Sequence, residues 1–237
     1  YTRACQHGSQ GKISAAMNDK TRANLETISV ATVVGPKPLN TPMMPIVGEA
    51  YTLRYIPMRE DLSTPEMLAR PDFAPRVAIE EAPSGSILVI DGRGRPDIAV
   101  VGDILIERLK VRGVTGLVSD GGLRDFDECL AADFPVFAAG PAAPASVTGH
   151  AAGDLQTPIS CGGVAVIPGD IIKADGDGVI VIPKALAEDI GRDGLEQERY
   201  ERFAKLRVSQ GRPVPGIYPP NDAAKAEYAA WLEAGEE

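Results

Sequence analysis

The sequence is poor in histidine, cysteine and concentrated positive charge. Its 237 residues include two histidines and three cysteines, and the formal net charge is −9. His7 and His150 have no companion at metal-ligand spacing, which excludes a histidine-rich zinc site. The cysteines form no CxxC pair, so we expect reduced thiols. Because phosphate backbones are bound by clustered Lys and Arg, we expect no nucleic-acid partner.

Long apolar runs are also missing. No run reaches the roughly 18 residues that span a bilayer, and no signal peptide opens the chain. We therefore expect a cytoplasmic protein without a membrane partner. Residues 1–16 are polar and patternless, and we expect them to be a disordered leader or a non-native remnant. Residues 17–237 show no repeat and no clean linker, which predicts one domain with a C-terminal helical tail.

Several familiar motifs are incomplete. Gly92-Arg93-Gly94 follows an apolar run, but Asp97 replaces the third glycine of a dinucleotide fingerprint. The DGDG at 175–178 has Leu186 where a calcium loop needs an acid, so we interpret it as a turn. There is no Gly-x-Ser-x-Gly elbow. The sequence thus disfavours nucleotide binding, calcium-loop chemistry and serine-hydrolase chemistry.

The order of apolar runs predicts an α/β fold. We expect strands at 46–56, 86–92, 98–103, 114–121 and 134–140, with short helices at 19–29 and 76–81. Helices at 103–112 and 125–132 give a β-α-β-α-β rhythm, which indicates right-handed crossovers and a partly parallel sheet. For helix 103–112 we expect an apolar face on four residues: Ile104, Leu105, Leu109 and Val111.

The second half has a different pattern. Residues 162–183 hold three short β-like runs joined by good turn residues, which predicts an antiparallel meander. A long helix at 184–209 and a short amphipathic helix should follow. We expect Trp231 in the last helix to be a packing anchor or a subunit contact.

The stretch 102–125 carries the candidate site. Asp103 stands where a helix N-cap is expected, and Asp125 with Glu128 has capping-box spacing, so both acids have a structural explanation. However, ligands of parallel sheets gather where strands end and helices begin, and helix starts favour anions. Arg124 and a divalent cation would offset two carboxylates beside an anionic ligand. Ligation by oxygen alone points to Mg²⁺ or Mn²⁺.

The pattern Asp103-x20-Arg124-Asp125 resembles the signature of the RraA-like family, which includes class II pyruvate aldolases and ribonuclease regulators. The resemblance extends to PVFAAG (135–140) and to CGGVAVIPGDIIKADGDGVIVIP (161–183), and TLRYIPMREDL (52–62) is similar to the regulator-named subgroup. The sequence departs from the pattern after 29–32, where an expected first-helix segment is shortened.

This resemblance implies one domain with a β/β/α core, a mixed sheet and flanking helices. It also implies a homotrimer or homohexamer with sites between subunits. Asp125 would hold the metal, Arg124 would contact the pyruvyl group, and Asp103 would order metal-bound water. Four consecutive positions would bind the substrate carboxylate: Gly102, Asp103, Ile104 and Leu105.

The implied activity is metal-dependent cleavage of a 4-hydroxy-2-oxo acid through a pyruvate enolate, with oxaloacetate decarboxylation as a side activity. Two alternatives stay open: a regulator that inhibits an RNA-processing ribonuclease, and a lyase or dehydratase acting on sugar-derived 2-keto acids. An acid of helix 184–209 could join a neighbouring subunit's site, with Glu196, Glu198 and Glu201 as candidates. The polar connection at 57–74 is the expected place for substrate selectivity.

Overall fold

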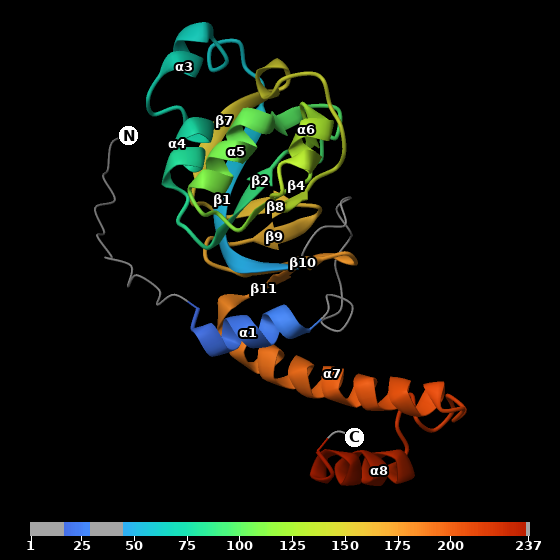
Figure 1. Cartoon of the computed structure of the whole chain (residues 1–237). Coiled ribbons are helices and arrows are strands. Elements are labelled where there is room, and N and C mark those ends of the chain that lie inside the picture. The colour runs from blue at the N-terminus through green and yellow to red at the C-terminus, as the bar shows by residue number, and fades with distance from the viewer. Residues whose placement is uncertain (1–16, 29–44, 236–237) are drawn as a thin grey trace, which may run out of the picture.

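The structure is a computed structural model that describes residues 17–28 and 45–235 (Figure 1). The expected leader at 1–16 and the shortened segment after 29–32 lie outside these residues. The described chain forms a single domain around a mixed sheet that curls into a half-barrel.

The main sheet of the described residues has the order β11-β10-β1-β2-β4-β6, and β7 also pairs with β1. Its strands are β1 (Ile46–Pro57), β2 (Ser86–Asp91), β4 (Gly116–Ser119), β6 (Val136–Phe137), β7 (His150–Leu155), β10 (Ile171–Asp175) and β11 (Gly178–Ile182). The neighbours β1, β2, β4 and β6 run parallel. This confirms the predicted parallel rhythm, with β7, β10 and β11 antiparallel to their partners.

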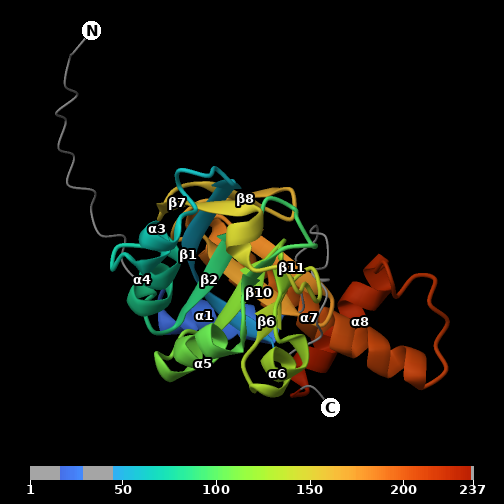
Figure 2. The ribbon, with the colours of Figure 1, turned by 90° about the horizontal axis from the view of Figure 1, so that it is seen from above.

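The sheet is buried on both faces, and most residues at the centre of its strands are apolar. In β2, Leu88 and Ile90 join the core formed with the helices, while Ile87 and Val89 join the core on the opposite face. The helices of the first face are α4 (Ala74–Glu81), α5 (Asp103–Val111) and α6 (Phe126–Ala131). Figure 2 shows them together on one side of the strands. This two-sided burial explains the continuous apolar run in the sequence.

A separate hairpin covers part of the second face. It consists of β8 (Ile159–Cys161) and β9 (Val164–Val166), which pair with each other. The predicted meander of three runs is wrong in one respect. β10 and β11 form the expected hairpin, but β9 pairs with β8, which precedes it in the chain, and not with β10. The side chains of three hairpin residues are buried against the sheet, which stabilises the pairing of β8 with β9: Ile159, Cys161 and Val166.

The predicted apolar face of α5 is half wrong. Leu109 is fully buried, but the other core residue is Ile106, three positions earlier. Ile104 is 78% exposed and Val111 is 68% exposed, while Leu105 packs at the edge of the core. The helix begins shortly after β3 (Ala99–Val101), and this entry direction turns Ile106 and Leu109 toward the sheet. Two large apolar side chains are left on the surface beside the site described below.

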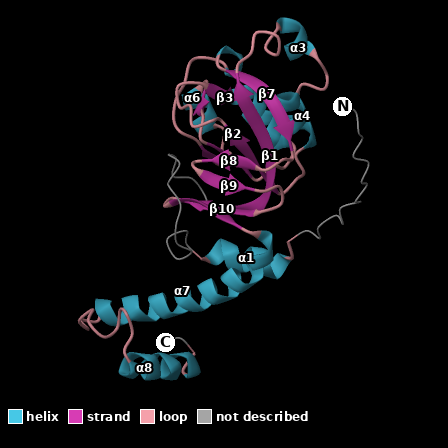
Figure 3. Ribbon diagram, turned by 180° about the vertical axis from the view of Figure 1, so that it is seen from behind, coloured by secondary structure: helices cyan, strands magenta, loops and turns pink. Residues whose placement is uncertain are grey.

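Three helices lie below the sheet in Figure 1: α1 (Asp19–Thr27), α7 (Ala187–Ser209) and α8 (Asp222–Glu233). Leu25 and Ile28 pack with residues of β10, β11 and α7. The outer part of α7 extends beyond the sheet and carries α8 with it (Figure 3). Trp231 is 6% exposed in an aromatic cluster with Phe203 and Tyr228, which confirms that it anchors packing.

The remaining short elements are α3 (Pro65–Ala69), within the polar connection at 57–74, and two 3-10 turns, η1 (Ser146–Thr148) and η2 (Lys184–Leu186). The predicted helix at 184–209 thus begins as η2 and continues as α7. Of the helices described, none is both long and apolar enough to cross a membrane.

Candidate functional site

A small parallel pair of strands brings the two ends of the 102–125 stretch together. β3 (Ala99–Val101) pairs with β5 (Gly122–Leu123) outside the main sheet, with Val101 opposite Leu123. The Arg124 amide donates to the Val101 carbonyl at 3.0 Å. The residues that follow each strand, Gly102 and Arg124, therefore lie side by side. The predicted meeting of the two loops is found, but β3–β5 produces it rather than the main sheet.

Gly102 leaves the space that the Asp125 carboxylate occupies. A Cβ at position 102 would lie 2.8 Å from Asp125 Oδ2 and 3.6 Å from Arg124 Cβ. The backbone at Gly102 is extended, with φ −129°, so any residue could adopt this conformation. A side chain at position 102 would therefore require the end of the Asp125 side chain to shift.

Asp125 has an unusual backbone. Its φ and ψ are both 49°, in the left-handed region, and its side chain forms no capping hydrogen bond. The predicted capping box with Glu128 is therefore wrong: in this conformation the carboxylate lies beside Gly102 instead of over its own helix. Left-handed non-glycine residues often occur at functional sites, where surrounding structure holds them. Here the β3–β5 pairing immediately precedes Asp125.

Asp103 is the first residue of α5, and the N-cap is Gly102. The predicted capping role of Asp103 is thus also wrong. Its Oδ1 accepts a hydrogen bond from the Ile104 amide at 2.7 Å, and the Leu105 amide bonds to the Gly102 carbonyl at 3.2 Å. Two of the four amides expected to bind a substrate carboxylate are therefore hydrogen-bonded within the loop.

Cys129 lies beneath the site and was not singled out by the sequence. Its fully buried thiol donates to the Arg124 carbonyl at 3.1 Å. Burial, followed by the negative charges of Asp103, Asp125 and Glu128, raises the pKa of this thiol to about 11. The thiol therefore stays protonated as a donor at neutral pH. The same effect shows that three carboxylates surround this point.

The carboxylates border a groove between α5 and α6. Its volume is about 520 Å³, and its lining residues are Asp103, Ile104, Glu107, Glu128, Ala131 and Ala132. Arg124 and Asp125 are both exposed and lie outside this lining. Among the described residues, neither forms an ion pair or side-chain hydrogen bond. Glu107 and Glu128 add acidity that sequence reasoning missed, because only the packing of α5 on α6 brings them together.

The donor set fits a hydrated divalent ion. Within the described part of the chain, no three His, Cys, Asp or Glu side chains gather closely enough to hold a metal. Asp125 offers an exposed carboxylate, and Mg²⁺ commonly keeps several waters beside one or two protein carboxylates. The excess of negative charge around Cys129 also favours a cation there.

The acids of α7 do not reach this site within one chain. Tyr228 donates to Glu196 at 2.9 Å, and Gln197 donates to Glu201 at 2.9 Å, so both acids have partners on the helical arm. Figure 1 shows α7 on the far side of the sheet from α5 and α6. A contribution from Glu196, Glu198 or Glu201 would have to come from another subunit.

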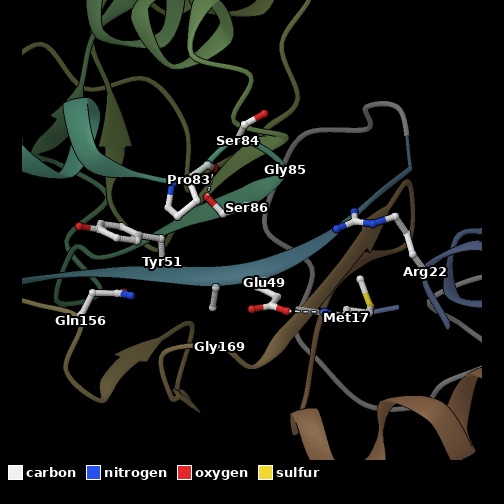
Figure 4. A pocket seen from close by; sticks show the side chains of 11 residues that line it. Met17, Arg22, Glu49, Tyr51, Pro83, Ser84, Gly85, Ser86, Gln156 and Gly169 are labelled. Carbon is white, nitrogen blue, oxygen red and sulfur yellow. Dashed lines mark hydrogen bonds between the residues drawn. The ribbon is translucent and has the colours of Figure 1, made fainter. Parts of the chain in front are cut away.

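A different cavity lies at the amino end of β2 and contains none of the predicted site residues (Figure 4). Glu49 accepts hydrogen bonds there from the Met17 amide at 2.7 Å and from Lys184 Nζ at 2.9 Å. Ser86 donates to the Pro83 carbonyl at 2.6 Å. These polar groups satisfy one another and tie α1 and η2 to the sheet, so we interpret the cavity as a structural junction.

Comparison with known proteins agrees with this fold. The RraA-like family model, described as Aldolase/RraA, matches residues 14–181. A Halalkalibacterium halodurans protein with the provisional name 4-hydroxy-4-methyl-2-oxoglutarate aldolase is 40% identical over 133 residues, covering 56% of this chain and 62% of that protein. Protein DlpA of Legionella pneumophila is 32% identical over 175 residues, which cover 74% of this chain and 27% of DlpA.

Solved structures show the same architecture. An uncharacterized protein from Pseudomonas syringae pv. tomato superposes with a TM-score of 0.74 at 24% identity, covering 86% of this chain and 95% of that one. RraAS2 of Streptomyces coelicolor, described as an unusual member of the RNase ES inhibitor RraA protein family, gives 0.70 at 25% identity, covering 81% and 98%. Because the family model spans most of its length, the chain belongs to the RraA-like family.

Proposed function

We propose that this protein is a divalent-metal-dependent lyase that cleaves a 2-keto acid through a pyruvate enolate. One observation carries the proposal: Gly102, Arg124 and Asp125 converge, and the Asp125 carboxylate fills the space that a Cβ at 102 would take. A purely structural acid would cap its helix, whereas this one has no capping bond. The curated relative with an aldolase name supports the same reaction class.

Asp125 would hold the metal, which we take to be Mg²⁺ or Mn²⁺. When bound, such an ion polarises a 2-keto carbonyl and stabilises negative charge at that oxygen. Asp125 provides a fixed anionic ligand because its backbone is held by the β5 strand before it and by α6 after it. The Cys129 thiol fixes the preceding carbonyl, that of Arg124.

Arg124 and Asp103 would act on the substrate itself. The exposed Arg124 guanidinium has no partner among the described residues, so it can bind the pyruvyl group and share the charge of the developing enolate. Asp103 can accept the proton of the C4 hydroxyl as the C3–C4 bond breaks, because one of its oxygens bonds the Ile104 amide and the other has no recorded partner among the described residues. C4 becomes a carbonyl as the bond breaks, and the released enolate would take the proton back from Asp103 at C3 to give pyruvate.

The test is a screen of 2-keto acids with coupled detection of pyruvate. The substrates should include oxaloacetate, 4-hydroxy-4-methyl-2-oxoglutarate and a sugar-derived 2-keto acid, each with Mg²⁺, with Mn²⁺ and with EDTA. We expect metal-dependent pyruvate release that is lost in Asp125→Asn and retained in Asp127→Asn, an exposed acid on the same helix. Release that is unchanged by EDTA, or retained in Asp125→Asn, would overturn the proposal.

A second candidate is a regulator that binds an RNA-processing ribonuclease. It is supported by the similarity to RraAS2, whose description names a ribonuclease inhibitor family. A ribonuclease assay distinguishes the two candidates: a regulator should inhibit RNA cleavage at micromolar concentration, and Asp125→Asn should inhibit equally well. No inhibition at that concentration would exclude this candidate.

We also propose a homotrimer or homohexamer. Ile104 and Val111 are exposed and lie seven residues apart on one face of α5, and apolar residues at this spacing on a surface helix support a subunit contact. Light scattering after size-exclusion chromatography measures the mass directly. A monomer would contradict this, and Ile104→Lys with Val111→Lys should dissociate the oligomer.

A further inference from the structure

A third cavity, distinct from the α5–α6 groove and from the cavity at the amino end of β2, opens where three parallel strands of the main sheet end. It lies at the carboxyl ends of β1, β2 and β4, has a volume of about 480 Å³ and shares no lining residue with the groove between α5 and α6. Its charged and hydroxyl-bearing lining residues are Arg54, Asp91, Arg93, Asp120 and Ser160, together with Tyr55. The size falls in the range of small-molecule sites, and the carboxyl ends of parallel strands are where such sites usually form.

Asp120 builds the floor of this cavity. Its Oδ1 accepts from the Gly92 amide at 2.7 Å, and its Oδ2 accepts from the Gly162 amide at 3.1 Å. Burial raises the pKa of Asp120, the negative charge of Asp91 adds to this effect, and the amides oppose it. Both oxygens are used to join the β2 loop to the β8–β9 turn, so Asp120 is a structural clasp.

Asp91 and Arg54 are available to a ligand. The two residues are paired in register on neighbouring strands, so their backbones lie side by side. Asp91 Oδ1 accepts from the Arg93 amide at 2.8 Å, whereas Oδ2 has only a long contact of 3.5 Å with the Ser160 amide. Arg54 is exposed, and its guanidinium has no partner among the described residues. The cavity therefore offers one free cation and one carboxylate oxygen with weak bonding.

Arg93 provides a second, fixed cation. Its Nη1 donates to the Gly149 carbonyl at 2.9 Å and lies 3.4 Å from His150 Nδ1. Burial, followed by the charges of Arg93 and Arg95, lowers the pKa of His150 to about 4 against the opposing charge of Asp97. The imidazole is therefore uncharged at pH 7, so it neither attracts nor repels a charged ligand. The Arg93 charge is held in place without being neutralised by this neighbour.

We propose that this cavity binds a small hydroxy-carboxylate, at a site separate from the proposed metal centre. Arg54 and Arg93 would bind the carboxylate, because guanidinium groups match its geometry and charge. Asp91 Oδ2 would accept a hydrogen bond from a ligand hydroxyl. Two carboxylates face two guanidiniums here, so the cavity has no surplus of positive charge for a phosphate dianion. A monoanion with several hydroxyl groups suits this balance.

Calorimetric titration of the full chain tests the proposal with three matched probes. D-gluconate carries both a carboxylate and hydroxyl groups, D-glucitol lacks the charge, and hexanoate lacks the hydroxyl groups. We expect saturable binding of gluconate and at least about tenfold weaker binding of the other two, since hydrogen bonds to charged groups contribute on this scale. Equal binding of all three probes, or no binding of gluconate at tens of millimolar, would overturn the proposal.

Variants then locate the site. Arg54→Gln and Asp91→Asn should each weaken gluconate binding about tenfold. The asparagine keeps an oxygen for the Arg93 amide, so this variant should fold. Arg70→Gln, which changes an exposed arginine paired with Asp72, should bind normally. Asp125→Asn should also bind normally, which separates this proposal from the proposed lyase. Binding that is lost in Asp125→Asn and kept in Arg54→Gln would contradict it.

Discussion

Two regions of the molecule use charged side chains in opposite ways. At the amino end of β2, Glu49 accepts hydrogen bonds from the Met17 amide and from Lys184, and Arg22 donates to the Val47 carbonyl at 2.6 Å. At the β3–β5 edge, Arg124 and Asp125 have no such partner among the described residues. The first region connects elements of the fold. The second holds its charges in place through the backbone and presents them to solvent.

The difference separates charged side chains that stabilise the fold from charged side chains that are available to a ligand. A charge with partners contributes to folding and is costly to remove. A charge positioned without partners contributes little to folding, and its placement requires another cause. At Asp125 the placement includes a left-handed backbone and a glycine whose side-chain space it fills. Variants in the two regions should therefore separate activity from stability.

The largest expected effect is that of Asp125→Asn. Asparagine adopts the left-handed backbone as readily as aspartate, so the free energy of unfolding should change by less than about 1 kcal/mol. Pyruvate release should fall at least about a hundredfold in kcat, as when one preorganised electrostatic group is lost. Urea denaturation and steady-state kinetics measure the two quantities. If the variant unfolded more easily and still released pyruvate at the wild-type rate, Asp125 would serve the fold and not the reaction.

Gly102→Ala should have the next largest effect. Its methyl group would lie 2.8 Å from Asp125 Oδ2 and displace the carboxylate. We expect about a tenfold or greater loss of kcat/KM, because displacements near 1 Å are costly in active sites. Gly176→Ala is the matched control, since a Cβ there meets no atom within 4 Å. Equal kinetics of the two variants would contradict the steric role of Gly102.

A titration at a third place in the molecule, the buried His150, should make the free energy of unfolding depend on pH. His150 is buried, stacks on Tyr55 with ring centroids 4.9 Å apart, and has a pKa lowered to about 4 from 6.5. Above pH 6.5 neither the folded nor the unfolded state binds a proton at this histidine. As the pH falls from 6.5 towards 4, the unfolded state binds it first, so stability decreases by about 1 kcal/mol per pH unit.

His150→Phe isolates this contribution. Phenylalanine preserves an aromatic ring against Tyr55 but cannot bind a proton. The slope of unfolding free energy between pH 4.5 and 6.5 should be smaller in the variant than in the wild type. Parallel slopes would show that His150 is not held neutral in the folded state.

Glu49→Ala should have the smallest effect, and it tests the opposite region. The substitution removes the hydrogen bonds that Glu49 accepts from the Met17 amide and from Lys184. The side chain of Glu49 is 28% exposed and that of Lys184 is 26% exposed. We expect a loss of about 1 kcal/mol in unfolding free energy, with kcat within about twofold of wild type. A large loss of activity at unchanged stability would contradict the structural role of this junction.

Much of the fold follows from the sequence because burial on two faces leaves a clear pattern. The runs that became β2 and β4 are apolar over Ile87–Ile90 and Leu117–Val118, and the β-α-β order around them correctly predicted a partly parallel sheet. The face of α5 was not, because Ile104, Ile106 and Val111 are equally apolar in sequence. Only the direction in which the helix leaves β3 selects Ile106 for the core.

The sequence predicted which residues form the candidate site, but it did not predict how their backbones and side chains are arranged. Sequence spacing placed Asp103, Arg124 and Asp125 at the ends of one unit, and the structure brings 102 and 125 together. Local patterns also predicted caps at both acids: the cap at Asp103 is wrong because Gly102 is the N-cap, and Asp125 is the N-cap of α6 but makes no capping bond with its side chain. The left-handed backbone of Asp125 and the buried bond from Cys129 depend on long-range packing, which no local motif records.

The central claim is that Asp125 binds a divalent metal at a site able to stabilise an enolate. Electron paramagnetic resonance of Mn²⁺ measures this directly, with oxalate as a planar mimic of the enolate. We expect wild-type protein and Asp127→Asn to bind Mn²⁺ more tightly when oxalate is present, and Asp125→Asn to bind it at least about tenfold more weakly. Equal Mn²⁺ affinity in wild type and Asp125→Asn would contradict the claim.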